Sequence, residues 1–196
     1  MEVKLCGHAT LASAYVIKRF FDTDVDIIDF NSLSGVLQVD VQQDVITLRF
    51  PVMPPMETEF RSLFLNCFDE KPTKVVKGSD FYFFEFDDED TVRRLKPEFS
   101  LISLLDDVMG IVVTAKGDDS DYVCRLFAPQ SGINEDPVTG SVQTTLAPYW
   151  SERLGKTKMQ VSQLSQRGGD LEVECKDEYV YIGGTATLYS KGEIYI

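Results

Sequence analysis

The sequence has almost no histidine and far fewer basic than acidic residues. His8 is the single histidine in 196 residues, and 19 basic residues against 32 acidic ones give a formal net charge of −13. A chain this acidic is not expected to bind nucleic acid or an anionic membrane. Any histidine chemistry rests on His8, and no zinc, P-loop or dinucleotide signature is present. We therefore expect neither a metal nor a cofactor.

Long apolar runs and closely spaced cysteines are also missing. No stretch approaches the length of a membrane span, and the first two residues do not begin a signal peptide. The four cysteines are spread along the chain at spacings that suit no metal site: Cys6, Cys67, Cys124 and Cys175. We expect reduced thiols and a cytoplasmic location. What is present is 43% hydrophobic and 11% aromatic residues, which predict a globular chain with a sizeable core.

The most informative stretch is residues 134–150, with the sequence NEDPVTGSVQTTLAPYW. Asp136 precedes a proline and indicates a turn, and Ser141 is a good N-cap for a helix over residues 142–149. Gly140 lies between them and has no side chain to keep a ligand from the main chain. Free N–H groups at a helix start suit a carboxylate or phosphate, so we interpret this stretch as a substrate site. The alternative is an ordinary turn followed by an N-cap.

Most of the remaining chain shows strand patterns. Alternating residues predict a hairpin over 33–51, with one buried and one exposed face on each arm. The acidic run at 87–90 is interpreted as the start of a solvated helix rather than a metal site, because basic residues end the same helix. The proline-rich segment 51–55 is the predicted boundary between domains at 1–55 and 56–196. The other expected strands are 2–5, 25–29, 73–76, 81–86, 110–116, 122–128, 159–164, 168–175, 179–182 and one or two within 186–196. The other expected helices are 9–21, a short one within 56–68, and 87–96.

An internal repeat emerges from these elements. Gly7 precedes a helix, and Gly35 follows 28 residues later (35 − 7) at the head of a hairpin. Gly140 precedes a helix, and Gly169 follows 29 residues later (169 − 140), again at the head of a hairpin. The order and the spacing agree, so we predict an α+β fold of two pseudo-symmetric halves, each a central helix wrapped by a mostly antiparallel sheet. The last strands could cross over to the first half. The two helix starts would face a shared cleft.

Several motifs carry a family resemblance. LCGHATLASAYV, RLFAP, NEDPVTGSVQTTLAPYW, LGK and QLSQRGGDLEV occur in this order from Leu5 to Leu171. Together they resemble the PhzF-like proteins of phenazine biosynthesis, which are relatives of diaminopimelate epimerase. The resemblance implies two barrel-like halves with the active site between them. It also implies a cofactor-independent isomerase that moves a proton on a small carboxylate-bearing substrate, and a homodimer.

The resemblance assigns roles to particular residues of this chain. The two helix-start glycines would offer N–H groups to a substrate carboxylate, and an arginine of the QRGG motif could pair with it, although that arginine could equally begin a hairpin. The implied catalytic residues are His8, Asp136 and Ser141, and the implied substrate-binding residues are Gly7, Thr139, Gly140 and Arg167.

The chain departs from the family pattern ahead of the CGHAT motif, where the family carries its acid/base glutamate. By the logic of the repeat, about 60 residues are missing before Gly7. We therefore expect an N-terminally truncated chain with an incomplete first half, exposed sheet edges and weak or absent catalysis.

Three functional hypotheses stay open. The first is a PhzF-like isomerase, and the second is an inactive remnant or carboxylate-binding protein. The third is a thiol-dependent racemase that uses Cys6, which directly precedes Gly7. A two-thiol mechanism needs a second thiol before Gly140, where Thr139 stands, so Cys6 is interpreted as a packed thiol.

Overall fold

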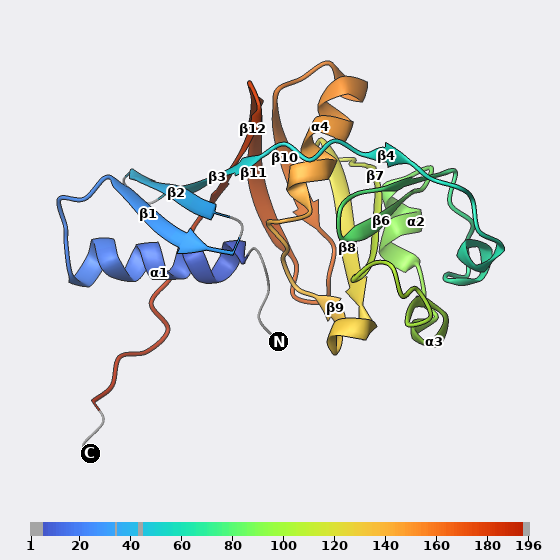
Figure 1. The fold of residues 1–196 in the computed structure, drawn as a ribbon, viewed down its shortest axis with the longest axis horizontal. Helices are drawn as coiled ribbons and strands as arrows, with labels where there is room; N and C mark the ends of the chain where they lie inside the picture. Colours follow the sequence, from blue (N-terminus) through green and yellow to red (C-terminus); the bar gives the residue numbers. More distant parts are fainter. Residues whose placement is uncertain (1–5, 34, 43–44, 194–196) are drawn as a thin grey trace.

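The computed structural model describes residues 6–33, 35–42 and 45–193, and within this part of the chain a single 12-stranded sheet dominates (Figure 1). Helices flank the sheet. The strands are β1 Ile27–Ser32, β2 Gly35–Gln42, β3 Val45–Pro51, β4 Met56–Glu57, β5 Lys74–Lys77, β6 Phe81–Glu85, β7 Gly110–Lys116, β8 Tyr122–Ala128, β9 Ile133–Asp136, β10 Lys158–Gln163, β11 Gly169–Lys176 and β12 Tyr179–Gly184. The helices are α1 Gly7–Phe20, α2 Glu89–Arg94, α3 Phe99–Ile102 and α4 Gln143–Leu154, with 3₁₀ turns η1 Ser62–Asn66 and η2 Pro129–Ser131.

The strand order is β1-β2-β3-β12-β11-β10-β8-β7-β6-β5-β4, and β9 pairs with β8. All neighbours are antiparallel except β8 with β10 and β6 with β7. After β3 the chain crosses to β4 at the opposite edge of the sheet, and it pairs with β3 again only at β12. The last strand of the first repeat unit, β3, therefore lies next to the last strand of the second, β12.

The two halves are related by a local two-fold axis. Each half is a helix followed by three antiparallel strands, namely α1 with β1–β3 and α4 with β10–β12. Leu37 and Leu171 are 134 residues apart (171 − 37), and so are Leu48 and Ile182 (182 − 48). Leu48 pairs directly with Ile182 where β3 meets β12. At this point of the sheet, a residue of the first half therefore lies opposite its counterpart in the second half. The predicted pseudo-symmetry and α+β class are confirmed.

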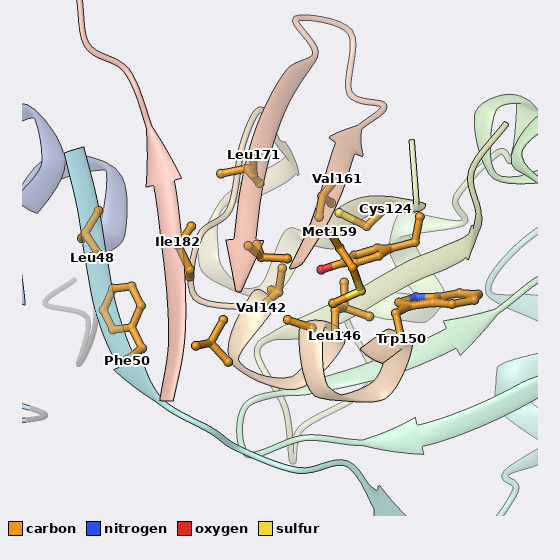
Figure 2. Packing of buried hydrophobic residues seen from close by; sticks show 14 of the residues in the cluster. Leu48, Phe50, Cys124, Val142, Leu146, Trp150, Met159, Val161, Leu171 and Ile182 are labelled. Carbon is orange, nitrogen blue, oxygen red and sulfur yellow. The ribbon is translucent and has the colours of Figure 1, made fainter. Parts of the chain in front are cut away.

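A hydrophobic core runs across the β3–β12 pair. The inward positions of β2 and β3 alternate with partly exposed ones, in the two-residue period that the sequence predicts, and their side chains join those of β10–β12 and α4. Figure 2 shows Leu48 and Phe50 of β3 on one side of Ile182 of β12, and Val142, Leu146 and Trp150 on its other side. A second core lies on the other face of β6–β8, under α2, α3 and η1. Strands β6–β8 are buried on both faces, which explains their continuous apolar sequences.

The two central helices are covered very differently. Seven of the 12 residues of α4 are buried, and only Gly7 and Ala14 of the 14 residues of α1 are. Val16, Phe20 and Phe21 are 39%, 42% and 81% exposed, and β1 is an edge strand of the sheet. Within the part of the chain that the structure describes, the first half is therefore the open one.

Helix ends differ from the sequence predictions. Helix α1 begins at Gly7, and α4 begins at Gln143 with Val142 at the N-cap, so Ser141 is not the cap that we expected. The backbone of Val142 is already helical, and no side-chain cap is made there. Helix α4 also runs beyond the expected residue 149 and ends at Leu154, where Gly155 follows in the left-handed conformation with φ 64°.

Helix α2 is shorter than the predicted 87–96. Asp88 accepts the Thr91 N–H at 2.6 Å and caps the helix, and Leu95 leaves helical geometry with ψ 135°. The chain therefore turns two residues before Pro97, in keeping with the acid-first, base-last charge order.

The predictions for the remaining segments had mixed outcomes. The strand expected at 2–5 lies outside the described residues, the helix expected within 56–68 is the 3₁₀ turn η1, and the strand expected at 25–29 runs instead from Ile27 to Ser32. The strand prediction for 186–196 is wrong over 186–193, which form no strand, and residues 194–196 lie outside the described residues. Lys191 lies 5.6 Å from the Phe20 ring of α1, and Tyr189 is fully exposed. Strand pattern alone makes no strand without a hydrogen-bonded neighbour.

No described helix has the length and apolarity to cross a membrane, and the 55/56 domain boundary stays a prediction.

We predict that amide hydrogens of α1 exchange faster than those of α4. Less buried apolar surface means a lower local opening free energy, and a difference of about 1.4 kcal/mol corresponds to about tenfold in exchange rate. Peptide-level hydrogen–deuterium exchange measures both helices in one experiment, with β7 as the protected control. Equal protection of α1 and α4 would contradict the open first half.

Candidate active site

The starts of the two central helices meet at a pair of glycines. A Cβ atom built on Gly7 would lie 3.7 Å from the Cα of Gly140, and one built on Gly140 would lie 3.9 Å from the Cα of Gly7. A Cβ on either glycine would therefore meet the other main chain at ordinary contact distance, so the space between the two is about one methyl group wide. The N–H groups of a helix's first turn point outward along a positive dipole end, so the junction is suited to an anion such as a carboxylate. The expected approach of the two helix starts is found, and the shared cleft stays a prediction.

An acid lies beside this junction. Asp136 ends β9, pairs with Leu126 of β8, and is half-buried. The Thr139 hydroxyl donates a hydrogen bond to the Asp136 carboxylate Oδ2. Thr139 itself is only 8% exposed. The loop from Asp136 to Gly140 is therefore held from within, and its carboxylate has a defined neighbour.

The residue that holds this loop is Gln163, which the sequence analysis missed. Its Oε1 accepts the Thr139 N–H at 2.7 Å, and its Nε2 donates to the Asp136 carbonyl at 2.8 Å and lies 3.3 Å from the Thr139 hydroxyl oxygen. Gln163 is 1% exposed and ends β10. A signal existed in the sequence, because Met159, Val161 and Gln163 occupy successive inward positions of one strand. An amide at the third position interrupts an apolar series.

Further buried polar groups lie beneath Gln163. The Tyr122 hydroxyl donates to Gln143 Oε1 at 2.6 Å, and Gln143 Nε2 donates to the Cys124 sulfur at 3.7 Å. Cys124 Sγ lies 4.0 Å from Gln163 Oε1. Burial raises the pKa of the Cys124 thiol to about 12, and burial also raises the pKa of Tyr122. Both groups therefore keep their protons at neutral pH and act as donors in a water-poor environment.

His8 and Cys6 lie on the α1 side of the junction. Cys6 is the N-cap of α1, and its Sγ lies 3.7 Å from His8 Nε2. His8 is exposed, and Cys6 is partly exposed. The two groups that could move a proton on this side are thus open to solvent, whereas Asp136 on the other side is half-buried.

Ser141 and Arg167 have different surroundings. Ser141 follows Gly140, and its carbonyl accepts the Thr144 N–H at 3.2 Å and the Thr144 hydroxyl at 2.7 Å. Arg167 is exposed and lines a depression of about 500 Å³ together with Glu89, Arg93 and Asp170. None of the other predicted site residues lines that depression. The substrate-binding role of Arg167 stays a prediction, as do the roles of the others.

The described residues contain no group of three or more histidine, cysteine, aspartate or glutamate side chains placed to hold a metal ion. The arrangement at the junction is therefore one of main-chain N–H groups, one carboxylate, one imidazole and one thiol.

This fold and junction define a class of proteins. A probable proline racemase from Agrobacterium radiobacter superimposes with a TM-score of 0.54 over 97% of this chain and 67% of its own, at 10% identity, which is a likeness of fold alone. The chain has the α+β fold of the diaminopimelate epimerase-like proteins.

Sequence comparison gives the family. The family model for phenazine biosynthesis-like proteins matches residues 1–192, and the chain belongs to this family. An uncharacterised isomerase of Pseudomonas aeruginosa is 39% identical over 196 residues, covering all of this chain and 75% of the relative. A crystal structure of a PhzF family protein from Enterococcus faecalis has a TM-score of 0.93 at 41% identity, and covers all of this chain and 75% of that one.

We predict unequal stability effects for two glycine-to-alanine substitutions near the junction. A Cβ on Gly140 meets only Gly7 at ordinary contact distance, so Gly140→Ala should change the free energy of unfolding by less than about 1 kcal/mol. A Cβ on Gly169 would lie 2.4 Å from a methyl of Val138, so Gly169→Ala should destabilise by about 1–3 kcal/mol. Urea unfolding of both variants beside the wild type measures this, and equal midpoints for the two variants would refute it.

Proposed function

We propose that the protein is a PhzF-type isomerase that shifts a proton on a small carboxylate-bearing metabolite without a cofactor. The observation that carries the proposal is the meeting of two helix starts at Gly7 and Gly140, next to the Asp136 carboxylate. Relatives named as isomerases, one of them 39% identical over the whole chain, support the reaction class.

The proposed roles follow from the chemistry of each group. Main-chain N–H groups at Gly7 and Gly140 receive the substrate carboxylate and favour negative charge that develops on it when a neighbouring carbon loses its proton. Asp136 and His8 accept and return protons, and the Ser141 hydroxyl donates to a substrate oxygen. The proton removed at one carbon is returned at another, so no electron acceptor is needed.

Two further residues have secondary roles in this proposal. Thr139 orients Asp136 through its hydroxyl, and Arg167 offers a second cation to the substrate. The family resemblance assigns the main acid/base to a glutamate ahead of the CGHAT motif. That residue is not among the described ones.

A second candidate is a carboxylate-binding protein without catalysis. The observation that favours it is the exposure of His8 and of most of α1, because water at the α1 side weakens the electrostatic stabilisation of a carbanion-like intermediate. A third candidate, a thiol-dependent racemase, is favoured by the 3.7 Å approach of Cys6 to His8. Cys6→Ser would abolish activity in the third candidate and leave it intact in the first.

We propose a cytoplasmic homodimer that acts on small molecules and binds neither nucleic acid nor membranes. The net charge of −13 supports the last point. Light scattering in solution tests the dimer, which would have twice the chain mass of 22.1 kDa.

The reaction itself is tested by deuterium incorporation. The purified chain is incubated in D₂O with a panel of amino, hydroxy and unsaturated C4–C8 acids, and incorporation at carbon is followed by NMR. We expect incorporation for at least one acid, and Asp136→Asn should lower its rate by about 100-fold, the usual contribution of a positioned acid/base. Asp118→Asn, in the exposed turn between β7 and β8, is the matched control and should exchange at the wild-type rate.

Two outcomes speak against the isomerase. Saturable binding of an acid that is lost in Gly140→Ala, without any deuterium incorporation, would support the carboxylate-binding protein instead. If no acid of the panel binds and none incorporates deuterium, both the isomerase and the carboxylate-binding proposals are wrong.

A further inference from the structure

We infer that Gln163 is a positioning residue that sets the shape of the Asp136–Gly140 loop and thereby directs the Asp136 carboxylate into the junction. That Gln163 holds the loop follows from its hydrogen bonds alone. That this matters for catalysis rests on the proposed isomerase function. Neither the charge pattern nor the family motifs assign this role to Gln163.

The side-chain amide of Gln163 closes the loop at both ends. The carbonyl of Asp136, at the start of the loop, accepts from Nε2 at 2.8 Å, and the N–H of Thr139, near its end, donates to Oε1 at 2.7 Å. A primary amide offers a donor and an acceptor side by side in a fixed geometry. The four residues from Asp136 to Thr139 are therefore clamped by one group.

The amide also decides which way the Thr139 hydroxyl points. Nε2 of Gln163 lies 3.3 Å from Thr139 Oγ1 and can act there only as a donor, so the oxygen accepts. The hydroxyl proton is then available for the Asp136 carboxylate, to which Thr139 donates. The series of hydrogen bonds runs in one direction, from Gln163 through Thr139 to Asp136, and keeps that carboxylate an acceptor.

Gln163 itself is held by rigid strands. It pairs with Cys124 of β8 on one side and with Gly169 of β11 on the other, and the next residue, Leu164, donates its N–H to the Cys124 carbonyl at 2.9 Å. The Cys124 thiol, 4.0 Å from Oε1, has its sulfur in contact with Gln143 Nε2 at 3.7 Å. The amide orientation of Gln163 is thus set by the core rather than by solvent.

A purely structural role for a buried glutamine makes a different prediction. Loss of any satisfied buried hydrogen bond destabilises a protein, wherever it lies. A positioning role requires in addition that the loop, and the exchange reaction, change when stability is matched. Thr114 provides the match, because it is 1% exposed, donates to the Val123 carbonyl at 2.8 Å and accepts from Trp150 Nε1 at 2.9 Å.

The experiment compares three variants of the full chain: Gln163→Met, Gln163→Glu and Thr114→Val. NMR follows the exchange protection of the Thr139 amide, and the D₂O assay follows incorporation into the reacting acid. We expect Gln163→Met to lower Thr139 protection by about 10- to 100-fold, as the loss of a buried hydrogen bond implies, and to lower incorporation by a similar factor. Thr114→Val should lower the melting temperature while Thr139 protection and incorporation stay near wild type.

Gln163→Glu adds a test of the donor half of the amide. The new carboxyl group is isosteric, but when ionised it cannot donate to the Asp136 carbonyl, and it places a negative charge near Asp136 and Cys124. When protonated, it regains one donor and one acceptor. Thr139 protection should therefore be low at neutral pH and recover as the pH falls, whereas Gln163→Met should show no recovery.

The outcomes separate this inference from the proposed function. If the wild type exchanges none of the acids but Thr139 protection responds as described, the isomerase proposal fails while the clamp stands. Thr139 protection that is unchanged in Gln163→Met, or equally lowered in Thr114→Val, would overturn the positioning role.

Discussion

The structure depends on the antiparallel pairing of β3 with β12. This seam lies on the local two-fold axis, with Leu48 paired to its repeat counterpart Ile182, and it joins two helix-plus-three-strand units into one sheet. Because each unit begins with a helix whose first turn lies near the axis, the same symmetry that joins the sheets brings Gly7 to Gly140. The candidate site is thus a consequence of the symmetry rather than a separate construction. A side chain at either glycine position would fill the space in which the two helix dipoles converge on an anion.

The polar groups under the site are the second constraint. A core built from valine, leucine and aromatic side chains contains a connected set of amide, hydroxyl and thiol groups that reaches from Tyr122 to Asp136. Buried polar groups are tolerated only when they are hydrogen-bonded, because each unpaired group carries a desolvation penalty. Here both the Oε1 and the Nε2 atom of Gln163 are hydrogen-bonded, and these bonds hold the loop at the edge of the core in one shape.

The two halves contribute unequally to the environment of the junction. Helix α4 is enclosed, so charges near its start act through a medium of low dielectric constant, whereas α1 presents His8 and a series of small apolar residues to solvent. Electrostatic interactions are several times stronger in the first setting than in the second. Among the described residues, the polar groups near the start of α4 are the more buried and the more fully hydrogen-bonded, and those near the start of α1 are open to water.

The sequence by itself determined the elements and their symmetry. Alternation in β2 and β3, the Gly155 helix end and the glycine spacing are local signals, since each follows from backbone geometry or from the two-residue period of a strand. Tertiary structure decided which strand lies beside which: β12 returns to β3, and residues 186–193 join no strand of the sheet despite a strand-like pattern. It also decided that Ser141 caps nothing and that Gln163 clamps the Asp136 loop from 24 residues beyond Thr139. Such contacts join residues that are distant in sequence, and their energies depend on burial and on which partner is within reach, neither of which a local pattern specifies.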